Sequence, residues 1–217
     1  MHIFKTPSLL RSLFPSLLWK MPPQSEQPTL YLTFDDGPIP DVTDFVVETL
    51  AQFQAKATFF CVGDNIQKHP QVFQRIQNAG NSVGNHTFNH LNGWRTPNAN
   101  YWENIKQCSQ VMQAHSVGNT PWQILEKPLF RPPYGRFTTQ QAIMIHQQFR
   151  IIMWDVLTND YDKRLTPEKC LRASLRSSAD GAIVVFHDSL KAAKNMMFTL
   201  PRYIAHFKEK GYQFAAL

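Results

Sequence analysis

Short apolar runs alternate with amphipathic stretches along most of the chain, beginning near residue 29. The apolar runs predict strands at 30–34, 57–62, 82–85, 129–130, 151–154, 182–186 and 212–215. Apolar residues at helical spacing predict helices at 42–53, 70–79, 98–115, 138–148 and 195–210. The polar stretch 156–165 predicts a loop. Regular alternation of strands and helices is typical of an α/β fold built on a parallel sheet.

The sequence carries no sign of a second domain. It contains no internal repeat, no low-complexity tract and no linker rich in glycine, proline and serine. With 217 residues, of which 43% are apolar, it is long enough to form one sizeable core. We therefore expect a single domain over residues 29–217, preceded by an N-terminal segment, residues 1–28, packed on that domain.

The N-terminal segment contains an apolar stretch, residues 9–19, that an arginine and a proline interrupt. It lacks the continuous apolar core and cleavage site of a signal peptide, and it is too short to cross a bilayer. Leu9, Leu13 and Leu17 fall at helical spacing, which favours packing against the domain, with binding to a membrane surface as the alternative. We expect no transmembrane segment and a cytoplasmic location.

Polar side chains suited to catalysis recur at one kind of position, immediately after an apolar strand. They are Asp35-Asp36, His86, Arg131, Asp155 and His187. The carboxyl ends of parallel strands meet at one edge of a sheet or barrel, and α/β proteins build their active sites at that edge. We therefore expect these residues to meet there, although they are far apart in the sequence.

Asp36, His86 and His90 have the side-chain types of a catalytic metal site. His86 and His90 are four residues apart, a spacing that directs both imidazoles to one side of a helical turn. Alone, this spacing is more often that of two surface histidines, and Asp35-Asp36 alone is compatible with a helix cap beside a solvated carboxylate. Together, two imidazoles and a carboxylate leave coordination positions open, as catalytic sites do. One zinc ion suits this set best, with cobalt, nickel or iron as alternatives.

The charge and the cysteine content argue against several kinds of partner and site. The chain has 22 Lys and Arg against 16 Asp and Glu, a net charge of +6, but no dense basic run, so we expect no nucleic-acid partner. Cys61, Cys108 and Cys170 form no CxxC spacing, which argues against a disulfide framework and a thiolate zinc site. The sequence does not reveal the oligomeric state.

Five segments, in order, resemble the motifs of the polysaccharide deacetylases, carbohydrate esterase family 4. They are residues 33–37 (TFDDG), 86–90 (HTFNH), 131–134 (RPPY), 154–161 (WDVLTNDY) and 184–187 (VVFH). Each motif alone is a weak signal, but all five in this order are specific for the family. The resemblance implies a single-domain distorted (β/α) barrel with the active site at the C-terminal ends of its strands. It also implies a divalent metal and removal of N-acetyl groups from an amino-sugar polymer or oligomer, peptidoglycan- or chitin-like.

The resemblance also implies roles for the residues at the start of the reaction. Asp36, His86 and His90 would hold the metal, and Asp35 would be the general base that takes a proton from water. Arg131 would pair with Asp35 and keep it charged, because an opposite charge nearby favours the ionised carboxylate.

Further roles follow for the departing group and the pocket. His187 would be the acid that protonates the leaving amine, oriented by Asp160, with Asp155 as a rival partner. The backbone N–H of Tyr134 would stabilise the oxyanion, and Val185 would line the pocket for the acetyl methyl group.

The chain departs from the family pattern at two positions that bear on substrate binding. Tyr161 stands where members often have tryptophan, and Leu157 stands where they often have an acidic residue. We therefore expect a different wall for the sugar pocket, with Tyr161 as one of its residues. Hydrolysis of a small non-sugar amide and a non-catalytic carbohydrate- or metal-binding module remain as alternatives. The intact Asp35, Arg131 and His187 argue against the module, which needs neither acid nor base.

Overall fold

The computed structural model describes residues 2–23, 27–118 and 126–217. Its strands form one curved parallel sheet in the order β5-β4-β3-β2-β1-β7-β6, with β8 paired to β1. The strands are β1 (Thr29–Asp35), β2 (Ala57–Cys61), β3 (Ser82–Asn85), β4 (Leu129–Phe130), β5 (Arg150–Ile151), β6 (Val156–Leu157), β7 (Ile183–His187) and β8 (Gln213–Phe214).

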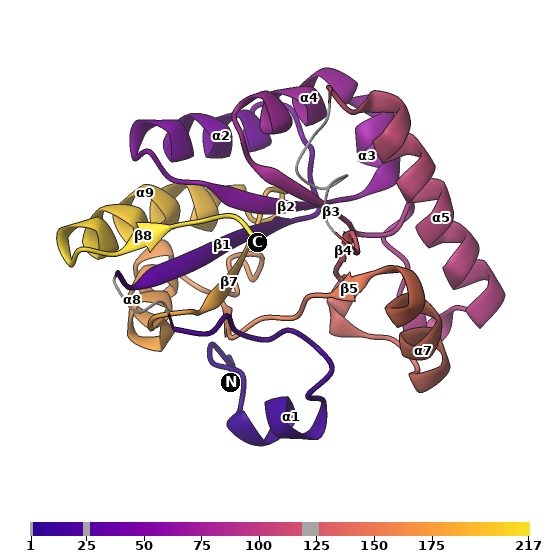
Figure 1. Ribbon diagram of the computed structural model, residues 1–217. Coiled ribbons are helices and arrows are strands. Elements are labelled where there is room, and N and C mark those ends of the chain that lie inside the picture. The colour runs from indigo at the N-terminus through magenta and orange to yellow at the C-terminus, as the bar shows by residue number, and fades with distance from the viewer. Residues whose placement is uncertain (1, 24–26, 119–125) are drawn as a thin grey trace.

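All the helices except α1, which lies in the N-terminal segment, are arranged around the outer side of the curved sheet, as Figure 1 shows. They are α1 (Ser8–Leu13), α2 (Val42–Gln52), α3 (Gly63–Lys68), α4 (Pro70–Asn78), α5 (Asn98–His115), α7 (Thr139–Gln148), α8 (Pro167–Ser177) and α9 (Ala193–Glu209), with the 3-10 turns η1 (Gly93–Arg95) and η2 (Pro133–Gly135). This arrangement confirms the expected single-domain distorted (β/α) barrel, here an open half-barrel of parallel strands.

The central strand β1 is buried along its whole length, so its sequence is mainly apolar up to Asp35 at its end. Phe34 lies opposite Phe59 of β2 and Phe186 of β7, and the rings stack with centroids 5.0 and 5.9 Å apart. The same register places Asp35 directly opposite His187. The packing of the core thus sets which polar residues face each other at the strand ends, because a one-residue slip would move every side chain to the other face.

The N-terminal segment pairs with backbone groups at the open edges of the sheet. Isolated bridges join Lys5 to Val156, Leu18 to Ile152 and Lys20 to Ala182. Such cover satisfies backbone groups that an edge strand would otherwise expose. Leu17 and Trp19 are buried with the side chains of β4, β5 and α7.

The three leucines at helical spacing in the N-terminal segment do not all pack against the domain. Leu9 and Leu13, both on α1, are 70% and 63% exposed, whereas Leu17 is buried. The helix has six residues and ends before Pro15, so the helical spacing is broken between the second and third of these leucines. Within the described residues, every helix is too short or too polar to cross a membrane.

The sequence-based assignment was wrong about part of the segment 156–165. Val156 and Leu157 form β6, which pairs in parallel with Val184 and Val185 of β7. Two residues are too few to show the alternation by which a strand is recognised in a sequence. The helices α3 and α8 were also not predicted: α3 has only six residues, and α8 has few apolar residues although they lie on one face.

The packing of the N-terminal segment predicts a measurable contribution to stability. Trp19 is 7% exposed, and its indole N–H donates to the carbonyl of Phe14 at 3.0 Å. Trp19→Ala should lower the free energy of unfolding by about 3–5 kcal/mol, the cost typical of a large buried ring. Urea denaturation measures this value. The control Leu13→Ala should change it by no more than about 0.5 kcal/mol because that side chain is exposed. Equal effects of the two variants would show that the segment is not docked.

Candidate active site

A buried ion pair between Arg131 and Asp35 forms the base of the site. Arg131 follows β4, is fully buried, and donates from Nη1 to Asp35 Oδ1 and to Thr33 Oγ1, each at 2.7 Å. Its Nη2 donates to the carbonyl of Met153 at 3.0 Å. The guanidinium lies 4.1 Å from the ring centroid of Phe60. A buried charge is tolerated when it is paired and hydrogen-bonded in this way, and the pairing fixes the Asp35 carboxylate at the end of β1.

Asp36, His86 and His90 converge beside this pair. His90 Nε2 lies 3.1 Å and His86 Nε2 3.8 Å from Asp36 Oδ1, and one ligand atom from each residue lies within 4.8 Å of the others. Two ligands on a tetrahedral zinc ion at about 2.0–2.2 Å are about 3.4 Å apart. The three side chains therefore have the chemistry and the spacing to bind one divalent ion.

Contacts behind the two imidazoles orient their metal-facing nitrogens. His86 Nδ1 donates to the carbonyl of Arg131 at 2.8 Å, which leaves the lone pair on Nε2. His90 Nδ1 lies 3.1 Å from the hydroxyl of Tyr134, whose ring packs edge-on at 4.6 Å. Burial, only partly opposed by the charges of Asp35 and Asp36, lowers the pKa of His86 to about 4. His86 is therefore neutral at neutral pH, the form that binds metals.

The Asp36 carboxyl is held in its charged form. Burial raises its pKa, but the hydrogen bond with His90 and the nearby imidazoles outweigh burial and hold the pKa well below its usual range. An ionised carboxylate beside a neutral imidazole is a suitable donor set for a zinc-like cation.

The backbone around these residues is irregular, which corrects the expected helical turn at 86–90. Thr87 and His90 have positive φ angles of 63° and 55°, so the segment is a loop. Asn104 of α5 holds that loop by accepting from the backbone N–H groups of Phe88 and Asn89, both at 2.9 Å. The two imidazoles are thus brought together by the loop conformation. The HxxxH spacing led to the wrong prediction because it is compatible with a helical turn as well as with a loop.

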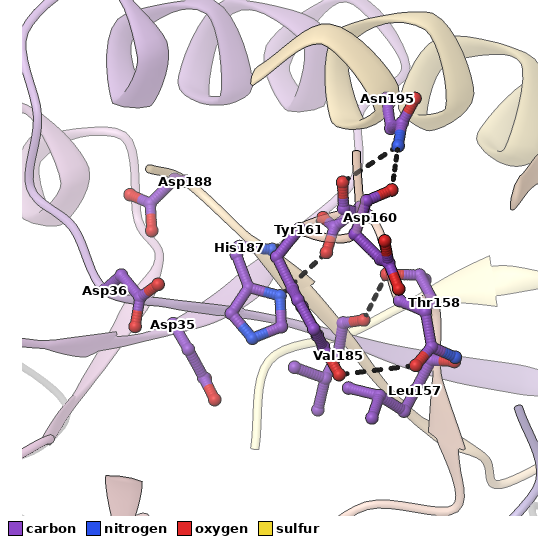
Figure 2. A network of polar contacts seen from close by, with 12 residues as sticks. Asp35, Asp36, Leu157, Thr158, Asp160, Tyr161, Val185, His187, Asp188 and Asn195 are labelled. Atoms are coloured by element: carbon purple, nitrogen blue, oxygen red, sulfur yellow. Dashed lines mark hydrogen bonds and ion pairs between the residues drawn. The ribbon is translucent and has the colours of Figure 1, made fainter. Parts of the chain in front are cut away.

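His187 and Asp160 form the other side of the site. His187 Nδ1 donates to Asp160 Oδ1 at 2.7 Å, and the His187 backbone N–H donates to Asp160 Oδ2 at 2.8 Å. Figure 2 shows the imidazole with Asp160 on one side and Asp35 and Asp36 on the other. Burial disfavours the charged imidazole, but the Asp160 carboxylate and then Asp36 and Asp35 outweigh burial and raise the pKa of His187 to about 9. His187 therefore carries a proton at neutral pH.

The loop that carries Asp160 is fastened to α9. Asn195 Nδ2 donates to the carbonyls of Asp160 at 3.0 Å and Leu165 at 3.1 Å. Asp155, the rival partner for His187, is instead bound by Lys5 at 2.6 Å and Arg11 at 3.3 Å. The geometry thus favours Asp160 over Asp155 as the partner of His187.

Asp188, the residue after His187, holds the backbone turn at Gly37. It is buried, accepts the Gly37 N–H at 3.0 Å and accepts the Thr43 hydroxyl at 2.6 Å. A Cβ at residue 37 would lie 2.0 Å from Asp188 Oδ2, so only glycine fits there. Burial raises the pKa of Asp188 to about 7, more than these hydrogen bonds lower it. This contact holds the turn that follows Asp35 and Asp36.

These residues surround a pocket of about 460 Å³ at the strand ends. Asp35, Asp36, His86, His90 and His187 line it, and Pro132, Tyr134, Arg136, Trp154, Leu157, Tyr161, Val185 and Lys191 complete its wall. The sequence-derived Tyr134, Val185 and Tyr161 therefore lie at the pocket, as does the unusual Leu157. Arg136 and Lys191 were not identified from the sequence, because an exposed cation in a loop carries no distinguishing pattern.

The arrangement supplies the parts of a hydrolytic site. The Asp35 carboxylate, paired with Arg131, and the protonated His187 imidazole lie on neighbouring strands at one pocket, and a cluster able to bind a cation lines the same pocket. A positioned base and acid on opposite sides of a reacting carbonyl are what amide hydrolysis requires.

Comparison with known proteins places the chain among related enzymes. Residues 23–149 match the model of a family described as polysaccharide deacetylase. A peptidoglycan-N-acetylglucosamine deacetylase of Bacillus cereus is 31% identical over 188 residues, which cover 86% of this chain and 66% of that protein. A chitooligosaccharide deacetylase of Azorhizobium caulinodans is 31% identical over 163 residues, covering 75% of this chain and 74% of the relative.

The fold has a close counterpart among solved structures. The Bc1960 peptidoglycan N-acetylglucosamine deacetylase superposes with a TM-score of 0.84 and 28% identity, covering 98% of this chain and 95% of that structure. The similarity therefore extends from the N-terminal segment through the sheet.

Proposed function

The chain belongs to the polysaccharide deacetylase family, and on this premise we propose that it is a metal-dependent hydrolase that removes N-acetyl groups from amino sugars of a peptidoglycan- or chitin-like polymer or oligomer. The observation that carries the proposal is the meeting of Asp35, Asp36, His86, His90 and His187 in one pocket. A binding module has no need of a base paired with arginine opposite a protonated acid.

The proposed site would hold one divalent cation, with zinc as the best fit and cobalt or nickel as alternatives. Asp36, His86 and His90 would be its ligands, since their donor atoms converge and His86 is neutral. When bound, such a cation polarises a carbonyl and lowers the pKa of water to about 7.

The remaining steps fall to side chains of this protein. Asp35, held by Arg131, would accept the proton of the attacking water. The backbone N–H of Tyr134, in the turn after β4, would donate to the developing oxyanion. His187 would give its proton to the leaving amine while Asp160 holds the ring, and Val185 would contact the acetyl methyl group.

The mouth of the pocket supports a glycan substrate over a small amide. Tyr134, whose hydroxyl lies beside His90, is 61% exposed, and Trp94, which packs against the pocket residue Arg136, is 63% exposed, so two flat rings lie open at or near the mouth. Flat aromatic faces suit the C–H groups of sugar rings, and a site closed around a small amide would bury them.

The proposed ligand set predicts metal content directly. Protein purified without added metal should contain close to one divalent ion per chain, as measured by elemental analysis. His90→Ala should lose most of it because one of three ligands is removed. The control His115→Ala, in the last turn of α5, should retain it. Full retention in both His86→Ala and His90→Ala would contradict the assignment.

Asp35 is predicted to act as the base without holding the metal. Asp35→Asn keeps an oxygen for Arg131 but cannot accept a proton, so kcat should fall by about 10²–10⁴-fold. Metal content, measured on the same sample, should be unchanged. Turnover close to that of the wild type would place the base elsewhere.

The pairing of His187 with Asp160 predicts the alkaline limb of the pH profile of kcat/KM. Asp160 raises the pKa of His187, so the protonated acid persists as pH rises and is lost when pH passes that raised value, about 9. Asp160→Asn removes the charge, lowers this pKa and should move the alkaline limb to lower pH. Asp155→Asn, the control, should leave it in place. The opposite pattern would exclude the Asp160–His187 pairing.

A further inference from the structure

Two cationic side chains line the mouth of the pocket from different strands of the sheet. Arg136 follows η2, after β4, and Lys191 follows β7, on the other side of β1 in the sheet order. Both are exposed. A substrate that enters the pocket therefore passes between loops that each carry one positive charge.

Each cation rests against an aromatic ring. The Arg136 guanidinium carbon lies 5.0 Å from the ring centroid of Trp94, and Lys191 Nζ lies 5.3 Å from that of Tyr161. Trp94 is itself fixed, because its indole N–H donates to the carbonyl of Phe137 at 3.0 Å. Cation–π contact holds the charges near these rings but does not neutralise them.

Among the other charges of the site, two carboxylates have charged partners and the third belongs to the proposed cation site. Asp35 pairs with Arg131 and Asp160 with His187, while Asp36 faces the two imidazoles. Across the described ranges, no carboxylate forms an ion pair with Arg136 or Lys191. Two uncompensated cations raise the local concentration of anionic substrates and repel cationic ones.

We propose that Arg136 and Lys191 select glycan strands that carry carboxylates beside the acetylated sugar, such as the lactyl carboxylate of a muramic acid unit, over neutral chitin-like strands. This inference rests on the proposed deacetylation. Neither side chain takes part in the reaction; each is a specificity-determining residue whose charge meets the substrate next to the reacting unit.

Acetate release from three substrates tests the proposal. They are an N-acetylglucosamine–N-acetylmuramic acid oligomer with free carboxylates, the same oligomer with its carboxylates methyl-esterified, and a neutral chitin oligomer of equal length. The wild type should prefer the free acid over its ester. Arg136→Gln and Lys191→Gln should each lower kcat/KM on the free acid by about 2- to 5-fold, mainly through KM, as expected for exposed ion pairs. The loss on the ester and on the chitin oligomer should be smaller, so the preference for the free acid should fall.

A matched control separates local charge from net charge. Arg172→Gln, on α8 in a different groove, removes one positive charge and should not alter the preference. Equal rates on the free acid and its ester, or equal losses on all three substrates in the Arg136 and Lys191 variants, would overturn the inference while leaving the deacetylase function in place. Acetate release from none of the three would overturn the proposed function and, with it, the inference.

Discussion

The buried ion pair of Arg131 with Asp35 is the interaction on which the geometry of the site depends. One arginine side chain joins β1, through Asp35 and Thr33, to the segment after β5, through the carbonyl of Met153. Its own carbonyl accepts from His86 and so directs the second nitrogen of that ring into the pocket. Removing one partner of such a pair typically costs about 3–5 kcal/mol, because a charge is left buried and alone.

Other polar contacts also hold reacting groups in place from neighbouring elements. Asp160 fixes the ring of His187 and raises its pKa, and Asn195 fixes the loop of Asp160 from α9. Asp188 fixes the turn at Gly37 that follows the Asp35-Asp36 pair. Each group that would react is thus held by a residue on another element. Positioned groups of this kind lower a barrier because their orientation is set before the substrate binds.

Much of the fold and of the candidate site could be predicted from the sequence, and the exceptions have physical causes. Strands such as β1 and β7 are buried on both faces, so each forms a mainly apolar run that can be recognised in the sequence, together with the polar residues at its end. The loop at 86–90 was mistaken for a helical turn because spacing alone does not report φ. The role of Thr33, the contact of Lys5 with Asp155, and the cations Arg136 and Lys191 depend on tertiary contacts between distant segments, which local patterns do not encode.

The central claim is that this pocket performs amide hydrolysis with a bound divalent cation and the fixed pair of Asp35 and Arg131. The most direct measurement is acetate release from an N-acetylated glycan oligomer by the purified protein, by the same protein after complete metal removal verified by elemental analysis, and after one equivalent of zinc is restored. The account predicts turnover that is lost on removal and returns with the added metal. Undiminished turnover by the verified metal-free protein would contradict it.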